Sequence, residues 1–244
     1  MYGDMNGSNQ RNFTQLKKLG VLGGMGPAAS AEFLRILAEE APAETDQEHP
    51  IVYLISDSQV PDRSSAILGK GNDPTERLKA DLLSLVQMGA DLLAVPCNTA
   101  HYFIDQFRSE LPVPLVHIVE ETVLAAQRLN PEGCWMLSTV GTRQSGLYQK
   151  YAQGIGYQLW LPDSGTAARV QESINLVKAG KQTEAGALIR AVVLGLWRER
   201  DVPVMAACTE LPLAYDASGL PPERTVSSLG ALVDACLHRI YSGV

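Results

Sequence analysis

Two cysteines stand at the ends of apolar segments, one in each half of the chain. Cys97 follows the apolar run 91–95, and Cys208 follows the run 202–207. Such runs predict buried strands of a parallel sheet, and the residues after Cys97 have helical spacing. Where a strand leads into a helix, free backbone N–H groups and the helix dipole favour negative charge. Cys97 is therefore biased towards thiolate, and Cys208 has nearly the same setting.

Two thiols that face one carbon atom from opposite sides could invert its configuration. One thiolate would remove a proton from the carbon, and the opposite thiol would deliver another. Sulfur suits this exchange because the unperturbed thiol pKa of about 8.5 makes both protonation states accessible near neutral pH. Backbone N–H groups at two helix starts would stabilise the charge that develops on a neighbouring carboxylate. This chemistry requires no metal.

Strand-like and helix-like segments alternate along the chain and would position the cysteines. Predicted strands cover residues 17–22, 51–56, 91–95, 115–118, 134–139, 157–161 and 202–207. Predicted helices cover residues 28–40, 74–88, 100–110, 143–154, 166–179, 183–200 and 227–241. Alternation of this kind is typical of βαβ units and parallel sheets. We expect an α/β fold of two similar lobes, each a mainly parallel sheet flanked by helices, related by pseudo-twofold symmetry with the active site between them.

The predicted lobes do not divide the chain at a single point. Residues 16–117 together with 219–244 would form the N-terminal lobe, to which the last helix returns. Residues 118–218 would form the C-terminal lobe, and the polar residues 1–15 are expected to be a disordered or frayed tail. Ligands of open parallel sheets bind outside the carboxyl ends of the strands, so both cysteines would approach one pocket.

Composition excludes several classes of function. The chain has 244 residues, 45% of them hydrophobic, which is enough for one large α/β domain or two small ones. The formal net charge of −7 provides no basic field for nucleic acid or an anionic membrane. No apolar run approaches the roughly 18 residues that span a bilayer, and the N-terminus does not resemble a signal peptide. We expect a cytoplasmic protein with reduced thiols, in which Cys134 and Cys236 are packing residues.

Four motifs carry a resemblance to a known family. They are GGMGP (23–27), PDR (61–63), PCNTAH (96–101) and CTE (208–210). In this order and spacing they resemble the aspartate/glutamate racemase family, most closely its aspartate racemase branch, over about residues 17–241. The resemblance implies a cofactor-independent amino-acid racemase with two similar α/β domains, often a homodimer.

The resemblance also implies roles for individual residues. Cys97 and Cys208 would be the opposed acid and base. Residues that would clamp the α-carboxylate of the substrate are Asn98, Thr99 and Thr209. Residues that would contact the acidic side chain of the substrate are Arg63 and Lys178. The glutamate racemase branch usually has His after the second Cys-Thr, whereas this chain has Glu210, which favours aspartate.

Three further residues are candidates for contacts with the substrate. Met25 lies in the Gly-rich turn that would border the pocket. Thr142 could contact a carboxylate, or it could belong with Thr139 to the cap of the following helix. Glu210 could hold the substrate ammonium, or it could be a first-turn residue that the helix dipole favours. Lys178 could likewise only complement a helix dipole.

Two patterns suggest other ligands but are incomplete. Residues 24–29 loosely match the dinucleotide fingerprint G-x-G-x-x-A, yet an acidic residue is missing about 20 positions on at the end of the next strand. A structural turn is the favoured interpretation. Cys97 and His101 could share a zinc ion with Cys208 and Glu210, but no CxxC or HExxH pattern supports a metal site. His101 is expected instead to support the cysteine loop or to cap the packing around it.

The sequence therefore predicts cofactor-independent racemisation of a small acidic amino acid, most of all aspartate. A two-cysteine isomerase of another small diacid, such as maleate, is the nearest rival. A non-catalytic protein that binds a ligand in the same cleft is a second, and a nicotinamide-dependent oxidoreductase is a more distant third. A homodimer is expected, with no nucleic acid or membrane partner.

Overall fold

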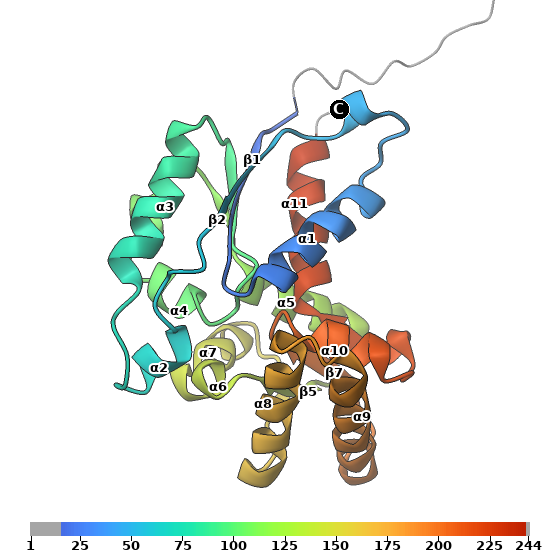
Figure 1. Cartoon of the computed structure of the whole chain (residues 1–244). Coiled ribbons are helices and arrows are strands. Elements are labelled where there is room, and N and C mark those ends of the chain that lie inside the picture. The colour runs from blue at the N-terminus through green and yellow to red at the C-terminus, as the bar shows by residue number, and fades with distance from the viewer. Residues whose placement is uncertain (1–15, 243–244) are drawn as a thin grey trace, which may run out of the picture.

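Two four-stranded parallel sheets organise the chain, one in each half. The computed structural model describes residues 16–242, and the two sheets lie in its upper and lower parts in Figure 1. The first sheet has the order β2-β1-β3-β4 and consists of β1 (Leu19–Gly23), β2 (Val52–Ser56), β3 (Leu92–Ala94) and β4 (Leu115–Val116). The second has the order β6-β5-β7-β8 and consists of β5 (Cys134–Ser138), β6 (Leu159–Trp160), β7 (Val204–Ala207) and β8 (Thr225–Ser227). The predicted α/β fold of two similar lobes is confirmed.

The same strand order in both sheets gives the two cysteines equivalent positions. Each cysteine follows the strand that is third in its sheet, β3 before Cys97 and β7 before Cys208. Every residue of both strands is buried. Pairing with the neighbouring central strand fixes the register, as between Val21 and Ala94 in one sheet and between Ser138 and Ala207 in the other.

Helices cover the faces of both sheets. They are α1 (Pro27–Glu40), α2 (Arg63–Ile67), α3 (Thr75–Gln87), α4 (His101–Ile104), α5 (Ile118–Leu129), α6 (Val140–Ser145), α7 (Leu147–Gly154), α8 (Ser164–Lys178), α9 (Gln182–Glu199), α10 (Leu211–Ala217) and α11 (Ser228–Tyr241). Short 3-10 turns cover Asp46–Glu48, Arg108–Glu110 and Pro222–Arg224. None of the helices within residues 16–242 is both long and apolar enough to cross a membrane.

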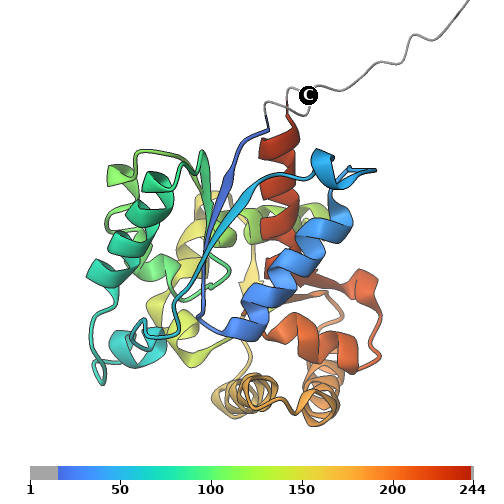
Figure 2. The same ribbon diagram turned by 45° about the horizontal axis from the view of Figure 1, so that its top comes forward.

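The last helix returns to the first lobe and packs into a core that both lobes share. Helix α11 packs against α1 and α5, and α1 and α11 lie side by side in Figures 1 and 2. The apolar core around it contains Leu19 and Val21 of β1 together with Met136 of β5 and Met205 of β7. One core therefore includes residues of both sheets. Each lobe also has a core of its own.

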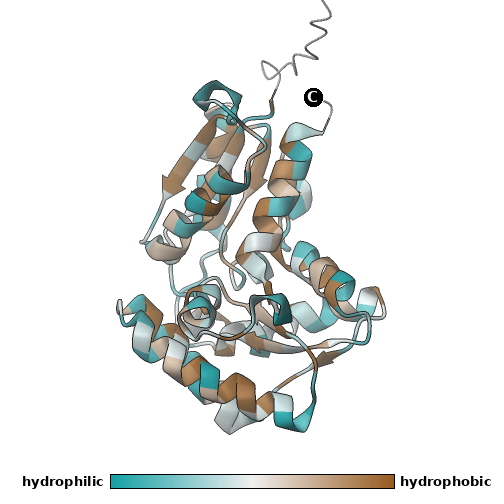
Figure 3. Ribbon diagram, turned by 90° about the vertical axis from the view of Figure 1, so that its right-hand side faces the viewer, coloured by the Kyte–Doolittle hydropathy of each residue, from teal (hydrophilic) through white to brown (hydrophobic). Residues whose placement is uncertain are grey.

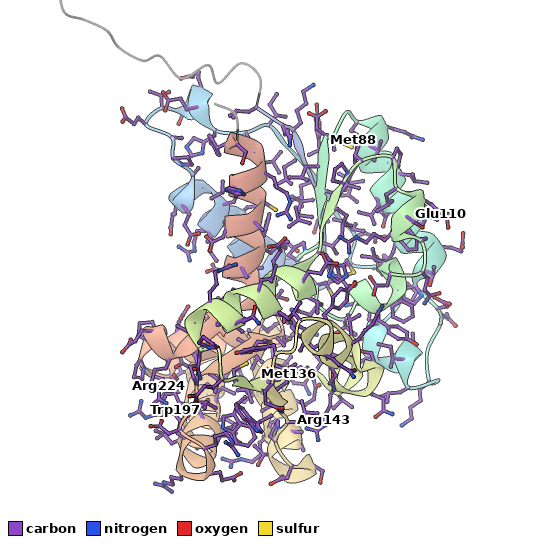
Figure 4. All side chains as sticks on the ribbon, turned by 180° about the vertical axis from the view of Figure 1, so that it is seen from behind. Met88, Glu110, Met136, Arg143, Trp197 and Arg224 are labelled. Carbon is purple, nitrogen blue, oxygen red and sulfur yellow. The ribbon has the colours of Figure 1, made fainter. Side chains whose placement is uncertain are left out.

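Hydropathy follows the layers. In Figure 3 the strands are largely brown, whereas many helices carry teal residues as well as brown ones. Figure 4 shows Met88 and Glu110 on the first lobe and Met136, Arg143, Trp197 and Arg224 on the second. The guanidinium of Arg224 lies 3.9 Å from the centre of the Trp197 ring, which covers part of this indole at the surface.

Several elements differ from the prediction. The expected helix 100–110 is interrupted: α4 ends at Ile104, and a 3-10 turn follows at Arg108–Glu110. The expected helix 143–154 begins earlier and breaks at Gly146, whose positive φ of 66° ends α6. The expected loop 57–73 contains α2, because Asp62 caps that short helix by accepting a hydrogen bond from the Ser65 N–H at 2.7 Å.

The C-terminal segment also differs. We expected residues 219–244 to belong to the N-terminal lobe, but β8 pairs in parallel with β7 in the second sheet. The return to the first lobe therefore begins only with α11, which Ser227 caps by accepting from the Gly230 N–H at 3.0 Å. The short strand β8 was missed because its three residues follow a Pro-rich turn and lack the length of a typical strand. The tail expected at residues 1–15 lies outside the described residues.

Candidate active site

Cys97 lies in a tight turn between β3 and α4. Its N–H donates to the Val95 carbonyl at 2.7 Å, and its own carbonyl accepts from Nδ1 of His101 at 2.9 Å. His101 is fully buried, and burial first, then the neighbouring His117, lowers the pKa of His101 well below its ordinary value. A neutral His101 thus holds the backbone of the cysteine loop, as the sequence predicts.

Cys208 lies in the equivalent place after β7, but its surroundings are different. Its thiol donates to Oε2 of Glu210 at 3.0 Å, and both side chains are buried. Burial, followed by the charge of Glu210, raises the pKa of Cys208 well above its ordinary value. The expected bias towards thiolate is therefore wrong for Cys208, because burial and a carboxylate outweigh the helix dipole.

Both thiols border one cavity between the lobes. Its lining consists of Met25, Asp62, Arg63, Ser64, Cys97, Asn98, Thr99, Thr139, Lys178, Cys208, Thr209 and Glu210. Nine of the ten predicted site residues are in this lining, and Thr142 is not. Asp62, Ser64 and Thr139 were not predicted. The PDR motif and the capping position of Asp62 were the signals that could have found the first two.

Three buried threonine hydroxyls, two of them from residues that line the cavity, join the lobes by hydrogen bonds. Thr99 Oγ1 lies 3.1 Å from Thr139 Oγ1 and 2.8 Å from Thr142 Oγ1, and Thr139 Oγ1 donates to Thr142 Oγ1 at 3.0 Å. Thr139 also caps α6 by accepting from the Thr142 N–H at 3.0 Å. Thr142 thus lies behind the lining and orients the two threonines that border the cavity.

Asn98 is held from both lobes. Its Nδ2 donates to Ser228 Oγ at 3.0 Å, and its Oδ1 accepts from the Tyr148 hydroxyl at 2.5 Å. Asn98, Tyr148 and Ser228 are all buried. These two hydrogen bonds hold the Asn98 amide in one orientation before any ligand binds.

Arg63 enters the cavity wall from the first residue of α2. Its Nη1 donates to the carbonyls of Val60 and Pro61, both at 3.0 Å, and its Nη2 donates to the Met25 carbonyl at 3.3 Å. Its Nε is buried and has no hydrogen-bond partner among the described residues. A buried guanidinium N–H without a partner is costly, and a carboxylate would satisfy it.

Glu210 and Lys178 lie close together in the cavity lining. Lys178 Nζ, at the end of α8, lies 3.9 Å from Glu210 Oε1. This oxygen is buried and accepts no hydrogen bond within residues 16–242, and a Cβ added at Gly26 would lie 3.1 Å from it. A larger residue at position 26 would therefore press on this carboxylate oxygen.

An outer hollow adjoins the cavity. It has a volume of about 410 Å3 and shares Met25, Arg63, Lys178 and Glu210 with the cavity lining. The cavity itself has a volume of about 20 Å3, which is room for about one water molecule. An amino acid can occupy it only if some of these shared side chains move.

Helix α2 of the first lobe borders the cavity and packs on the second lobe. It packs against α6, and the contact is so close that a Cβ added at Gly141 would lie 2.5 Å from Ser64 Oγ and 2.6 Å from Ser64 Cα. Only glycine at position 141 permits this approach, because a backbone atom on the other side cannot yield.

The residues next to the thiols do not form a metal site. No group of three or more His, Cys, Asp or Glu side chains in the described part of the chain is arranged to hold a metal ion. His101, the candidate histidine, donates from Nδ1 to the Cys97 carbonyl, and its Nε2 accepts from the Ile118 N–H at 3.5 Å. Its ring nitrogens are therefore engaged away from the cavity.

Comparison with known proteins gives a consistent result. The family model described as Asp/Glu/Hydantoin racemase matches residues 22–236. The broad specificity amino-acid racemase RacX of Bacillus subtilis (strain 168) is 28% identical over 207 residues, which are 81% of this chain and 87% of RacX. The structure of an aspartate racemase from Picrophilus torridus superimposes with a TM-score of 0.80 at 27% identity, covering 92% of this chain and 94% of that one. A glutamate racemase from Thermus thermophilus shares the fold at 20% identity, with a TM-score of 0.61 and coverage of 90% and 78%.

Proposed function

Because the chain belongs to the Asp/Glu/hydantoin racemase family, we propose that it interconverts L- and D-aspartate without a cofactor, with Cys97 and Cys208 as the two bases. The observation that carries this proposal is that thiols from equivalent strand ends of the two lobes border the same cavity. One sulfur takes the α-proton as the Cα–H bond breaks, and the other donates a proton as a Cα–H bond forms on the opposite face.

The polar lining supports an acidic substrate. Asn98, Thr99 and Thr209 provide amide and hydroxyl groups for the α-carboxylate. Hydrogen bonds to Ser228 and to Thr142 hold Asn98 and Thr99, respectively, before binding. Arg63 and Lys178 supply the positive charge for the second carboxylate. The unpartnered Nε of Arg63 supports this role, because a bound carboxylate would give it an acceptor.

The relatives bear on the range of substrates. The protein from Picrophilus torridus is named an aspartate racemase, which supports aspartate here. RacX is named a broad specificity amino-acid racemase, so a wider range of side chains is the second candidate. The outer hollow favours that alternative, since a longer side chain could extend past Met25 into it.

Solvent exchange tests the reaction. The purified protein is incubated in deuterated water with each enantiomer of aspartate, and the products are separated by chiral chromatography and weighed by mass spectrometry. We expect each enantiomer to give the other with deuterium at Cα. Fumarate formation from maleate would indicate the diacid isomerase instead, and thermal stabilisation by aspartate without turnover would indicate a binding protein.

Single substitutions test the two thiols. Cys97→Ala and Cys208→Ala are each expected to lower kcat/KM at least ~100-fold, the usual minimum for loss of a general acid or base. Cys236→Ala is the matched control, because Cys236 is buried on α11 away from the cavity lining and its loss is expected to affect stability only. Activity that survives either cavity substitution would refute the two-base mechanism.

A further inference from the structure

The two thiols have unequal surroundings, and the difference lies in one side chain. The Cys208 thiol donates a hydrogen bond to Glu210 Oε2 at 3.0 Å, and Thr209 Oγ1 donates one to the same oxygen at 3.4 Å. The cavity surface around Cys97 includes no carboxylate that accepts from its thiol in the described structure. Glu210 is 3% exposed, so water screens its charge little.

We propose that Glu210 is a positioning residue that keeps the proton on Cys208 in the resting enzyme and so assigns Cys97 the role of the first base. The inference rests on the proposed function for its kinetic consequence only. A carboxylate that accepts from a thiol stabilises the protonated sulfur and opposes the thiolate. The raised pKa of Cys208 agrees with this contact.

The remaining charges around Cys208 do not reverse this preference. The titratable and charged groups that face it from the surrounding elements are Glu210 in its own loop, Lys178 of α8, Arg63 of α2, Tyr148 of α7, Asp62 before α2 and Cys97 across the cavity. Lys178 opposes Glu210 but is 3.9 Å from Oε1, the oxygen that does not contact the thiol, and its side chain is 43% exposed. Water therefore screens the cation more than the buried carboxylate.

Proton balance gives the consequence for turnover. Cys97, as thiolate, removes the α-proton from the substrate, while the Cys208 S–H bond breaks and its proton goes to the opposite face of Cα. When the product dissociates, Cys97 is protonated and Cys208 is a thiolate beside Glu210. The contact makes this state less stable than the resting one, so the proton has to return from Cys97 to Cys208 through solvent before the next turnover in the same direction.

Thiolate absorbance tests the contact without a substrate. In a Cys97→Ala background, the ultraviolet absorbance of the Cys208 thiolate is titrated with and without Glu210→Gln, with the Cys97→Ala, Cys208→Ala double variant as blank. Glu210→Gln keeps the size of the side chain and removes its charge. We expect the titration midpoint of Cys208 to be lower by about one pH unit or more in this variant, the usual effect of losing a close like charge.

Matched variants keep the test decisive. Asp62→Asn removes the other carboxylate of the cavity lining, which does not contact Cys208, and is expected to leave the midpoint unchanged. If Glu210→Gln does not fold, Lys178→Met, an exposed position, is expected to raise the midpoint, because it removes the cation that opposes Glu210. A midpoint that stays in place in folded Glu210→Gln, or in Lys178→Met, overturns the inference.

Kinetics in the Cys97-containing enzyme provide the second readout. In the direction in which Cys97 is the base, Glu210→Gln should move the alkaline limb of the kcat/KM profile to lower pH and leave the acidic limb in place. A merely structural role would instead lower kcat/KM equally at every pH. If the protein racemises nothing, the proposed function fails while the thiolate titration still decides the role of Glu210.

Discussion

Asp105, at the end of α4, connects the histidine pair behind Cys97 to the second lobe. Its Oδ1 accepts from His117 Nε2 at 3.1 Å and from the Tyr151 hydroxyl at 3.0 Å, and Lys150 lies 3.3 Å from Oδ2. His117 packs edge-on against His101, with ring centres 4.5 Å apart. Tyr151 and Lys150 belong to α7, so one carboxylate of the first lobe holds a helix of the second.

Loss of the Asp105 charge should destabilise the protein in a pH-dependent way. Burial alone would raise the pKa of Asp105, but the hydrogen bond and charge of His117, with Tyr151 and Lys150, lower it to about 2. A lowered pKa contributes stability that is complete above the unfolded value of about 3.9 and is lost as the pH falls towards 2. Asp105→Asn is expected to lower Tm by about 2–4 °C at pH 7, and the difference should narrow below about pH 4.

Differential scanning calorimetry between pH 7 and pH 3 measures this difference. Asp201→Asn is the control, because Asp201 is exposed at the surface, where its ion pair with Arg224 contributes little, and Tm should stay unchanged throughout. An Asp105→Asn difference that is constant over the whole pH range would contradict the prediction.

At the scale of elements, the packing of α2 on α6 decides how the cavity closes. Gly141→Ala should favour the α6 helix by its intrinsic propensity but push α2 away through Ser64, and Arg63 with it. We expect kcat/KM to fall about 10- to 100-fold, since a displacement of about 1 Å at a site has effects of that size. Gly195→Ala in α9, where a Cβ meets nothing within 4 Å, should leave kcat/KM unchanged.

Steady-state kinetics together with hydrogen exchange over residues 57–73 distinguish the two variants. Faster exchange of this segment in Gly141→Ala alone would show that α2 has been displaced. Wild-type kinetics in Gly141→Ala would mean that catalysis does not depend on the position of α2.

Local patterns predicted the elements that carry the cysteines but not those that close the site. The buried runs before Cys97 and Cys208 gave both strands, because apolar residues bounded by turns are a local signal. Helix α2 has a local capping signal at Asp62, but its five residues are too few to give a helical pattern, and its packing against α6 is a tertiary contact that no local pattern reveals. The thiol of Cys208 was misjudged for the same reason: its protonation depends on burial and on how the Glu210 side chain turns, both set by tertiary packing.

At the scale of the whole molecule, α11 makes the two lobes one folding unit. Its buried face packs into the core that contains residues of both sheets, and Arg239 Nη2 donates to Glu121 Oε1 of α5 at 2.6 Å. A core shared in this way predicts a single cooperative unfolding transition rather than one for each lobe.

Leu232→Ala tests this cooperativity. Leu232 is fully buried on α11, so its truncation is expected to lower the free energy of unfolding by about 2–5 kcal/mol. The three tryptophans, Trp135, Trp160 and Trp197, all lie in the second lobe, whereas far-ultraviolet circular dichroism reports on both lobes. The denaturant midpoints from fluorescence and dichroism should shift together.

Leu194→Ala is the matched control for this experiment, since Leu194 is exposed on α9 and its truncation should change the midpoint little. Separate transitions for the two signals, with the fluorescence midpoint unmoved in Leu232→Ala, would show that the lobes unfold independently.

The triad of threonine hydroxyls has a consequence for altering substrate preference. Thr99 belongs to one lobe, and Thr139 and Thr142 belong to the other. Replacing any of them would leave a buried hydroxyl without its hydrogen-bond partner at the contact between the lobes. Directed evolution should therefore accept few changes at these threonines. It should accept many around Met25 and Lys178, which border the outer hollow and take no part in these hydrogen bonds. Libraries for new substrates belong at the mouth of the site.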